Sequence, residues 1–378
     1  MKEQQLNIIS FDVPFPPNYG GAVDVFYKIK ALYRLGVKIH LHCFEYGRGK
    51  QKELNKYCQS VTYYQRDKNK AKLLSKLPFV VATRKNEKLL KNLNKNEYPI
   101  LIEGLHNCWF LDELKPSKRF VAVRTHNVEH DYYKGLAKVE KSLFKKQFFL
   151  SEAKKLKAFE PVLKKADLLL SISPNDTDYF NSKYKNAKYL PAFHSGEEVT
   201  AKTGFGKFAL YHGNLGVGEN NEASLYLIDI FSKLDYPLIL AGSDPSKELI
   251  KKVSQYKNVL LSGNISFTEM ENLIADAHIN ILPTFQPTGI KLKLISALYK
   301  GRFCVVNKYM IQNTGLEEAC YEANTPAKFR KLVIELIGQE FKLADLELRK
   351  KVLLNKFNNL SNAKKLVEFV FYSKFLPE

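Results

Sequence analysis

Short apolar runs rich in β-branched residues alternate with longer amphipathic stretches along nearly the whole chain. This alternation is typical of parallel sheets that are covered by helices on both faces. The first half contains six strand candidates: LNIISF, KIHLHCF, VTYYQ, PILIEG, FVAVRTH and ADLLLSIS. The second half contains five: FALYHGN, PLILAGS, NVLLSGN, INILPT and RFCVVN. The pattern predicts an α/β fold with two Rossmann-like, doubly wound domains facing across a cleft.

The boundary between the two domains is expected in residues 190–208, which are rich in glycine, threonine and charge and lack helical periodicity. We assign residues 1–190 to an N-terminal domain and residues 205–360 to a C-terminal domain. Residues 361–378 have helical apolar spacing, and we expect them to pack back on the first domain. Doubly wound sheets bind ligands beyond the carboxyl ends of their strands, where the strand order reverses. The candidate chemistry is therefore sought at those ends.

The composition agrees with a folded protein of two domains. The 378 residues are enough for two cores, and 45% hydrophobic residues exclude a disordered chain. The five cysteines are scattered without paired spacing, which argues against a disulfide framework or structural zinc and favours a reducing compartment. No signal peptide and no apolar run of about 20 residues is found. The expected location is cytoplasmic.

The net charge of +20 is concentrated in the first half of the chain. Residues 1–200 carry 36 basic and 21 acidic side chains, whereas residues 201–378 carry 23 and 18. Such a face suits an anionic lipid or a phosphorylated substrate, or is a solvated lysine-rich surface. The stretches 70–85 and 141–159 are compatible with peripheral contact with the inner membrane face or with ordinary domain helices. No nucleic-acid-binding motif is present, so no nucleic acid partner is expected.

A glycine pair follows the first strand, in PFPPNYGGAVDVF. Gly20 and Gly21 precede a predicted helix, and paired glycines let backbone N–H groups approach an anion at a helix N-terminus. Plain turn geometry is the alternative explanation. The absence of GxGxxG counts against a nicotinamide-dependent dehydrogenase.

The segment VAVRTHNVEHDYY places several polar residues at the exit of a buried strand. An imidazole at such a strand end can hydrogen-bond a substrate hydroxyl or orient a carboxylate, so His126 is the candidate catalytic residue. The alternative is a polar helix start, with Asn127 as the N-cap and Glu129 favouring the helix dipole.

Three strands of the second half end in glycine, at positions 213, 242 and 263. Gly213 with Asn214, and Gly242, would leave clearance for a flat or phosphorylated ligand. Turn chemistry alone also explains many such glycines.

The segment PTFQPTGIKLKLISALYKG predicts a helix that opens at Thr288, Gly289 and Ile290. Lys291 and Lys293 then lie in its first turn, where cations are unfavourable against the dipole by up to ~1 kcal/mol. A bound diphosphate would compensate, met by backbone N–H groups and an ammonium. The alternative is that both lysines point to water.

Together, PPNYGGA, RTHNVEHDYY, YHGNLGVGENN, LILAGSDP and GIKLKLISALYKGRFCVVN resemble the retaining GT-B glycosyltransferases, in particular the bacterial family 4-like branch with HNVEH and GIKLK motifs. The resemblance implies a hexosyltransferase-like enzyme that moves a sugar from a nucleotide-diphosphate donor to a glycan or polyprenyl-linked acceptor in surface polysaccharide synthesis. It also implies that no cofactor and no metal are required, that residues 1–190 form the acceptor-side domain and that residues 205–360 form the nucleotide-sugar-binding domain.

By this resemblance, Gly20 and Gly21 lie near the donor phosphates and His126 faces the donor sugar. Gly213 and Asn214 lie by the nucleotide, and the segment from Gly289 to Lys293 lies beside the diphosphate.

The chain departs from the family where two glutamates are usual. Thr288 and Ser296 replace them, and Ser296 removes a charge-assisted ribose contact of ~1.5–3 kcal/mol. One alternative function is therefore a catalytically degenerate homologue that binds a nucleotide, a glycan or a partner enzyme. Another is a changed reaction such as sugar-nucleotide epimerisation, for which more carboxylates and histidines would be expected.

Overall fold

The structure is a computed structural model that describes residues 3–114, 119–140, 142–286 and 292–372. The chain divides into two compact units. Unit 1 consists of Met1–Ala137, Ser142–His194 and Phe357–Glu378. Unit 2 consists of Lys138–Lys141 and Ser195–Lys356.

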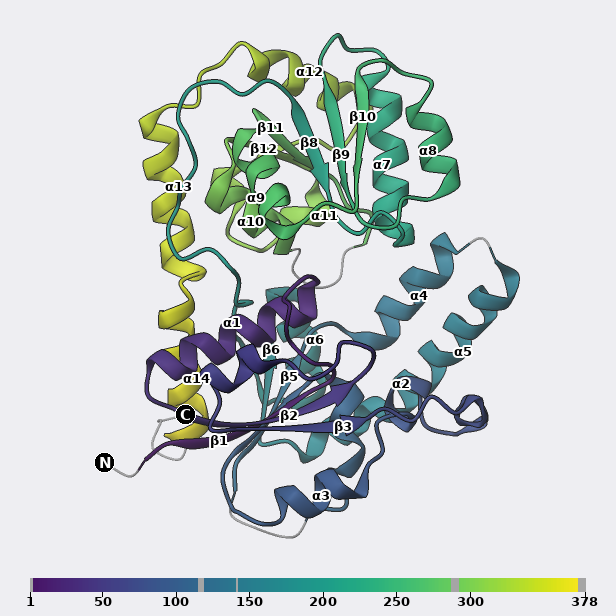
Figure 1. Ribbon diagram of the computed structural model, residues 1–378, viewed down its shortest axis with the longest axis vertical. Coiled ribbons are helices and arrows are strands. Elements are labelled where there is room, and N and C mark those ends of the chain that lie inside the picture. Colours follow the sequence, from purple (N-terminus) through teal and green to yellow (C-terminus); the bar gives the residue numbers. More distant parts are fainter. Residues whose placement is uncertain (1–2, 115–118, 141, 287–291, 373–378) are drawn as a thin grey trace. The chain divides into compact units, whose positions relative to one another are not determined.

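Unit 1 is built on a parallel sheet of seven strands in the order β3-β2-β1-β4-β5-β6-β7 (Figure 1). The strands are β1 Gln5–Ser10, β2 Lys38–Glu45, β3 Ser60–Gln65, β4 Ile100–Glu103, β5 Val121–Thr125, β6 Leu168–Ser171 and β7 Ala187–Tyr189. In the register, Ile8 of β1 lies between Leu41 of β2 and Leu101 of β4. All three side chains are fully buried. Because strand order reverses between β1 and β4, their carboxyl ends form the switch point of this sheet.

Helices cover both faces of the unit 1 sheet. They are α1 Gly20–Arg34, α2 Phe79–Ala82, α3 Glu87–Leu93, α4 Glu129–Val139, α5 Leu143–Phe159, α6 Pro174–Tyr184 and α14 Asn359–Phe371, with 3-10 helices η1 Lys52–Lys56, η2 Lys70–Leu74, η3 Leu105–Phe110 and η4 Glu160–Lys165. The C-terminal helix α14 lies beside α1 (Figure 1), and Leu366 and Val370 share a buried cluster with Val25 and Ile29. The last helix of the chain thus completes the core of the first unit.

Unit 2 repeats this plan with six parallel strands in the order β10-β9-β8-β11-β12-β13. The strands are β8 Ala209–His212, β9 Leu238–Gly242, β10 Val259–Gly263, β11 Ile279–Leu282, β12 Phe303–Val306 and β13 Tyr321–Glu322. The helices are α7 Gly218–Phe231, α8 Lys247–Val253, α9 Phe267–Asp276, α10 Leu292–Lys300, α11 Lys308–Ile311, α12 Pro326–Ile337 and α13 Leu343–Lys356, with the 3-10 helix η5 Glu317–Ala319. Here the switch point lies at the carboxyl ends of β8 and β11.

The predicted fold class, with two Rossmann-like α/β domains, is confirmed, and each of the eleven predicted strands is present. Two strands were missed: β7 has three residues and β13 has two. Both are edge strands, too short to show a strand pattern in the sequence. Residues 190–208 contain no helix and none of the named strands, since β8 begins at Ala209, but their first five residues are buried. This start of the segment is therefore packed as part of unit 1.

None of the helices in the described parts of the chain is both long and apolar enough to cross a membrane.

Candidate functional site

A buried network of charged side chains lies at the switch point of unit 1. Glu103 ends β4, and its Oε1 accepts a hydrogen bond from Lys28 Nζ at 2.7 Å. The same ammonium donates to Asp24 Oδ2 at 2.9 Å, one turn earlier on α1. All three side chains are at most 2% exposed. Charges buried this deeply require close partners, and here each carboxylate has one.

Arg124 of β5 completes the network from the other side of Asp24. Its Nε and Nη2 donate to the two carboxylate oxygens of Asp24 at 3.2 and 3.0 Å. Its Nη1 donates to the carbonyl of Leu190 at 2.5 Å, and Nη2 also donates to the carbonyl of Pro191 at 3.1 Å. This forked pairing fixes both α1 and the start of the 190–208 segment to the sheet.

The network keeps its two carboxyl groups ionised. Burial alone would raise the pKa of Asp24, but the charges of Arg124 and Lys28 lower it below its ordinary range. Burial likewise opposes ionisation of Glu103, and Lys28 together with the hydrogen bond from His126 lowers its pKa. The nearby cations therefore outweigh desolvation at both sites.

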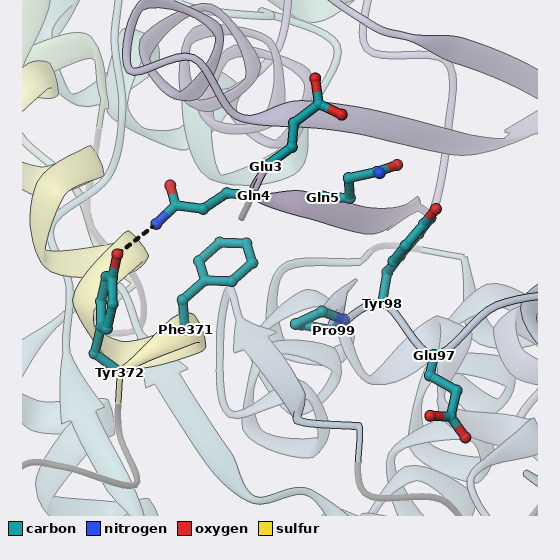
Figure 2. Close-up of a pocket in the computed structure, with 8 residues that line it drawn as sticks. All are labelled: Glu3, Gln4, Gln5, Glu97, Tyr98, Pro99, Phe371 and Tyr372. Atoms are coloured by element: carbon teal, nitrogen blue, oxygen red, sulfur yellow. Dashed lines mark hydrogen bonds between the residues drawn. The ribbon is translucent and has the colours of Figure 1, made fainter. Parts of the chain in front are cut away.

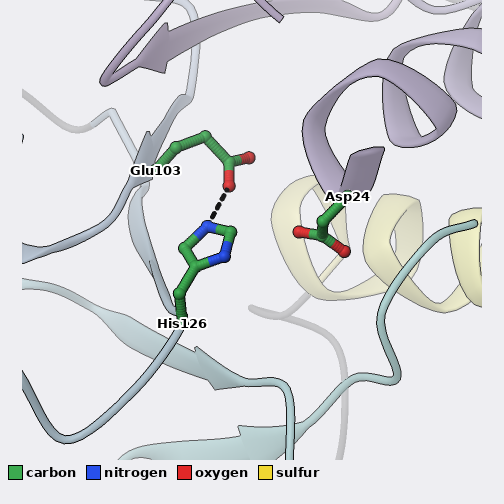
Figure 3. Close-up of side chains that lie close together, drawn as sticks. All are labelled: Asp24, Glu103 and His126. Carbon is green, nitrogen blue, oxygen red and sulfur yellow. Dashed lines mark hydrogen bonds and ion pairs between the residues drawn. The ribbon is translucent and has the colours of Figure 1, made fainter. Parts of the chain in front are cut away.

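His126, the predicted catalytic residue, follows β5 directly and contacts this network. Its Nε2 lies 3.0 Å from Glu103 Oε2 (Figure 3). Because an ionised carboxylate only accepts hydrogen bonds, we assign the proton to Nε2. The ring also packs edge-on against Phe11, with centroids 5.4 Å apart. Nδ1 has no hydrogen-bond partner within the described ranges.

Asp24, Glu103 and His126 each offer one ligand atom, and these atoms lie within 4.8 Å of one another (Figure 3). That residue set and spacing are compatible with a metal ion. However, the ammonium of Lys28 is already bonded to both carboxylates, so a metal would have to replace a buried cation. The residues therefore fit an ion-pair network better than a metal centre.

The predicted glycine pair begins α1 at Gly20. The N-cap residue, Tyr19, makes no side-chain capping bond, and the first turn has no acidic residue. A Cβ atom on Gly21 would lie 2.5 Å from Cζ of Phe11. Packing against Phe11 therefore accounts for the glycine at 21, and the same ring contacts His126.

In unit 2, Lys293 lies in the first turn of α10, as predicted. Its Nζ donates to Asn220 Oδ1 at 2.7 Å and to the Tyr211 hydroxyl at 3.1 Å. The ammonium also lies 4.8 Å from the centroid of the Tyr211 ring. The alternative that this lysine points to water is wrong. Its charge is held at the carboxyl end of β8, beside the start of α7.

A second set of contacts joins the ends of the neighbouring strands. The hydroxyl of Thr284, two residues after β11, donates to the carboxylate of Glu219 in the first turn of α7. Thr284 also exchanges hydrogen bonds with Asn307, which follows β12: its N–H donates at 3.1 Å and its carbonyl accepts at 2.7 Å. The switch point of unit 2 is thus lined by polar groups that are fixed to one another.

The predicted donor-binding glycines are packed closely at this switch point. A Cβ atom on Gly242 would lie 1.6 Å from the carbonyl oxygen of Gly213, so strand packing alone requires a glycine there. A Cβ atom on Gly213 would lie 3.1 Å from the amide nitrogen of Asn220. Asn214 Oδ1 accepts from the backbone N–H of Gly216 at 2.9 Å and shapes the turn into α7.

His212, at the end of β8, is 6% exposed. Burial, followed by the nearby charge of Lys293, lowers its pKa to about 3, so the imidazole is neutral. Its Nε2 is buried and has no hydrogen-bond partner in the described segments. Buried polar atoms are normally hydrogen-bonded, so this nitrogen is an exception.

Ser296 is half-buried on α10, three residues after Lys293, so the two side chains lie on the same side of the helix. The predicted residues Thr288, Gly289, Ile290 and Lys291 lie outside the described residues.

Sequence reasoning selected His126 and Lys293 as candidates but did not predict their hydrogen-bond partners. Glu103 had one available signal, a single acid at the end of an apolar strand. Lys28 also had a signal, because it falls on the apolar side of the predicted helix, four residues after Asp24. The contact of Lys293 with Tyr211 had no signal in the sequence, since tyrosine is common in buried strands.

A separate cavity of about 410 Å³ lies at the opposite end of the unit 1 sheet. Figure 2 shows its lining, which includes Gln4 and Tyr98, with the Gln4 amide donating to the hydroxyl of Tyr372 at 3.0 Å. It lies at the amino end of β1 and just before β4. It is therefore far along the strands from the switch point, and none of the predicted site residues lines it.

No family model matches the chain. A curated protein of Klebsiella pneumoniae, described as an uncharacterized 44.6 kDa protein in the cps region, is 26% identical over 354 residues, covering 86% of this chain and 89% of that protein.

Solved structures resemble the chain over almost its full length. The lipopolysaccharide outer core galactosyltransferase WaaB matches with a TM-score of 0.63 and 14% identity, covering 98% of this chain and all of that chain. An α,α-trehalose-phosphate synthase (UDP-forming) from Burkholderia xenovorans, in complex with glucose-6-phosphate, matches with a TM-score of 0.66 and 10% identity, covering 97% and 99%. The fold is that of the GT-B glycosyltransferases.

Proposed function

We propose that the chain is a retaining, hexosyltransferase-like glycosyltransferase that moves a sugar from a nucleotide-diphosphate donor to a glycan or polyprenyl-linked acceptor. The observation that carries the proposal is the position of Lys293, fixed by Asn220 and Tyr211 at the switch point of unit 2. Doubly wound sheets bind nucleotides at this point. The GT-B fold supports a nucleotide sugar as the ligand, since the Burkholderia neighbour is described as UDP-forming.

In this proposal, Lys293 meets the donor diphosphate together with the residues before α10, including Thr288, Gly289, Ile290 and Lys291. Negative charge grows on the diphosphate as the sugar leaves. An ammonium already held in place stabilises that charge without reorganising, which is the largest single contribution in many enzymes. Gly213, Asn214, Gly242 and Ser296 would border the nucleotide.

His126 is proposed to contact the sugar. With its Nε2 proton given to Glu103, Nδ1 is a hydrogen-bond acceptor for a sugar hydroxyl. Glu103 would act as a positioning residue, because its carboxylate is itself fixed by Lys28. Gly20 and Gly21 would offer the uncapped start of α1 to the donor phosphates.

A role in bacterial surface polysaccharide synthesis is supported by the Klebsiella relative from a cps region and by the likeness to a lipopolysaccharide galactosyltransferase. Neither donor binding nor sugar transfer is expected to need a metal or another cofactor. We further propose that the protein works in the cytoplasm, with peripheral contact with the inner membrane face where a lipid-linked acceptor is used.

The test is incubation of the purified protein with a panel of nucleotide sugars, followed by mass spectrometry of the products. The proposal predicts release of a nucleoside diphosphate from one donor, accelerated by the correct acceptor, with the anomeric configuration kept. Absence of both binding and turnover with every common donor would refute it.

A second candidate function is a degenerate homologue that binds a nucleotide without transfer. Ser296 favours it, because a half-buried hydroxyl stands where the resembled family carries a glutamate. In that case a donor binds without turnover, and Ser296→Glu tightens nucleotide binding through a charge-assisted contact with the ribose. Turnover by the natural sequence would exclude this candidate.

A further inference from the structure

Two arginines lie close together beyond the carboxyl end of the unit 1 sheet and have no acidic partner. Arg66 directly follows β3, and Arg84 follows α2 by two residues. Arg84 is only 7% exposed. Among the ion pairs of the described residues, none involves either guanidinium. Buried charges are normally paired, so this arrangement needs an explanation.

Both guanidinium groups are held by neutral partners. Arg84 Nε donates to the carbonyl of Phe11 at 3.0 Å, and its Nη1 donates to the carbonyl of Val80 at 2.6 Å. Arg66 Nε donates to the Thr83 hydroxyl at 2.9 Å. The terminal nitrogens that remain, Nη2 of Arg84 and both of Arg66, have no hydrogen-bond partner within the described ranges. The two guanidinium groups are thus held in place and still have N–H groups that can donate to a ligand.

An aromatic ring supports the outer arginine. The guanidinium of Arg66 lies 4.4 Å from the centroid of the Tyr46 ring, and the ammonium of Lys68 lies 4.5 Å from the same centroid. The ring faces attract these cations but do not neutralise them. A third positive charge therefore lies near the pair.

The arrangement is electrostatically costly in the absence of a ligand. Burial, followed by the charge of Arg66, lowers the pKa of Arg84 to about 9. Burial also lowers the pKa of Arg66. The acids in the neighbourhood have other partners. The charge of Asp12 acts on both arginines but does not offset their burial, and its carboxylate accepts from the Tyr19 hydroxyl and the N–H of Val13, both at 2.8 Å.

Two other acids close by are also engaged. Glu129 lies 3.5 Å from His106 Nε2. Glu152 accepts from the N–H of Phe79 and pairs with Lys155 at 3.2 Å.

Two other buried arginines show what a structural role looks like in this chain. Arg124 makes a forked ion pair with Asp24. Arg349 has no such acid, but both of its terminal nitrogens donate to backbone carbonyls, those of Gly301 and Arg302. Arg66 and Arg84 follow neither pattern, because neither makes an ion pair and each keeps terminal N–H groups without a hydrogen-bond partner among the described residues.

We propose that Arg66 and Arg84 form an anion site that binds a phosphate group of the acceptor substrate. The planar, fixed donors of arginine match the oxygens of a phosphate, and two of them can share one dianion. Assignment to the acceptor rests on the proposed function, in which the donor diphosphate belongs to Lys293 in unit 2. A soluble sugar phosphate and a polyprenyl phosphate present the same group.

Calorimetric titration of the full-length protein, first saturated with UDP, tests the proposal. Two probes distinguish the sources of the phosphate: glucose 6-phosphate for a soluble acceptor and farnesyl phosphate for a lipid-linked one. We expect one of them to bind. Arg66→Gln and Arg84→Lys should each weaken its affinity about tenfold or more, because each removes charge-assisted hydrogen bonds. Arg34→Gln, an exposed arginine at the end of α1, should leave it unchanged.

The controls separate this proposal from the function on which it rests. UDP affinity should stay unchanged in all three variants; an equal loss of UDP affinity would assign the two arginines to the donor and overturn the proposal. If the Arg84→Lys variant does not fold, the Arg66→Gln variant is sufficient for the test, because Arg66 is only half-buried. If the protein binds no UDP, the proposed function fails, and the titration without UDP still tests the anion site. Binding of neither probe, or equal binding by the variants, overturns it.

Discussion

At the scale of single residues, the two candidate sites use their charges differently. In unit 1, Asp24, Lys28 and Glu103 compensate one another and are almost inaccessible. In unit 2, Lys293 is fixed by the amide oxygen of Asn220 and the hydroxyl of Tyr211. The first set fixes α1 and the ring of His126 to the sheet, and the second is proposed to bind the donor.

Removing the Lys293 charge is expected to weaken nucleotide binding with little effect on stability. We predict that Lys293→Gln lowers the affinity for UDP about tenfold or more, because it removes a charge-assisted contact of ~1.5–3 kcal/mol with the diphosphate. Isothermal titration measures the change. Lys247→Gln, at an exposed lysine in the first turn of α8, is the matched control. Equal UDP affinity of the Lys293 variant and the control would remove Lys293 from the site.

Removing the buried charge of Lys28 is expected to have the opposite profile. Lys28→Met leaves two buried carboxylates without their shared partner, which should lower the free energy of unfolding by about 3–5 kcal/mol. Denaturant titration measures this loss. Lys134→Met breaks an exposed pair with Asp131 and should cost under about 1 kcal/mol. A Lys28 variant as stable as the Lys134 variant would show that the network is not needed for folding.

At the scale of secondary-structure elements, the ends of β8 and β9 are packed against each other through glycine. Gly242→Ala places a methyl group 1.6 Å from the Gly213 carbonyl oxygen. Backbone must move to relieve this overlap, so we predict destabilisation by roughly 1–3 kcal/mol or more. At Gly263, which ends β10, the nearest atom to an added methyl group is 3.8 Å away. Gly263→Ala should therefore melt close to the natural protein, and equal melting temperatures of the two variants would contradict the account.

Elements with long apolar runs were predictable from the sequence, and contacts between elements were not. Strands such as β1 and β5 are buried on both faces, so their composition alone distinguishes them from the helices. The position of His126 at a strand end followed from the same pattern. Its bond to Glu103 depends on the pairing of β4 with β5, which could not be predicted from the sequence pattern. The arginine pair needed the same information, since 17 residues separate Arg66 from its Thr83 contact.

At the scale of the whole molecule, buried histidines make stability depend on pH, and three of them have the largest pKa shifts. Burial lowers the pKa of His42 and His194 to about 4 and that of His212 to about 3. All three are neutral in the folded protein at pH 6, while an unfolded histidine has a pKa of about 6.5. As the pH falls below about 6.5, the unfolded state binds protons that the folded state does not, and stability decreases.

Melting temperatures measured from about pH 7.5 to about pH 5 should therefore fall steadily below about pH 6.5. The pKa values of Asp24 and Glu103 are lowered in the folded protein, so these carboxyl groups reduce the stability only below about pH 5. The effect of the histidines on the melting temperature can therefore be measured above that pH. His42→Gln should reduce the slope, because it removes one of the histidines with a strongly lowered pKa. A melting temperature that stays constant across this range would mean that the histidines are not buried as described.

Binding of a nucleotide-sugar donor at the switch point of unit 2 is best tested by hydrogen–deuterium exchange of the intact protein with and without the donor that binds best. We predict slower exchange at the end of β8, in the first turn of α7 and at the start of α10. Unchanged exchange in all three, with protection confined to the cavity at the amino end of β1, would contradict it.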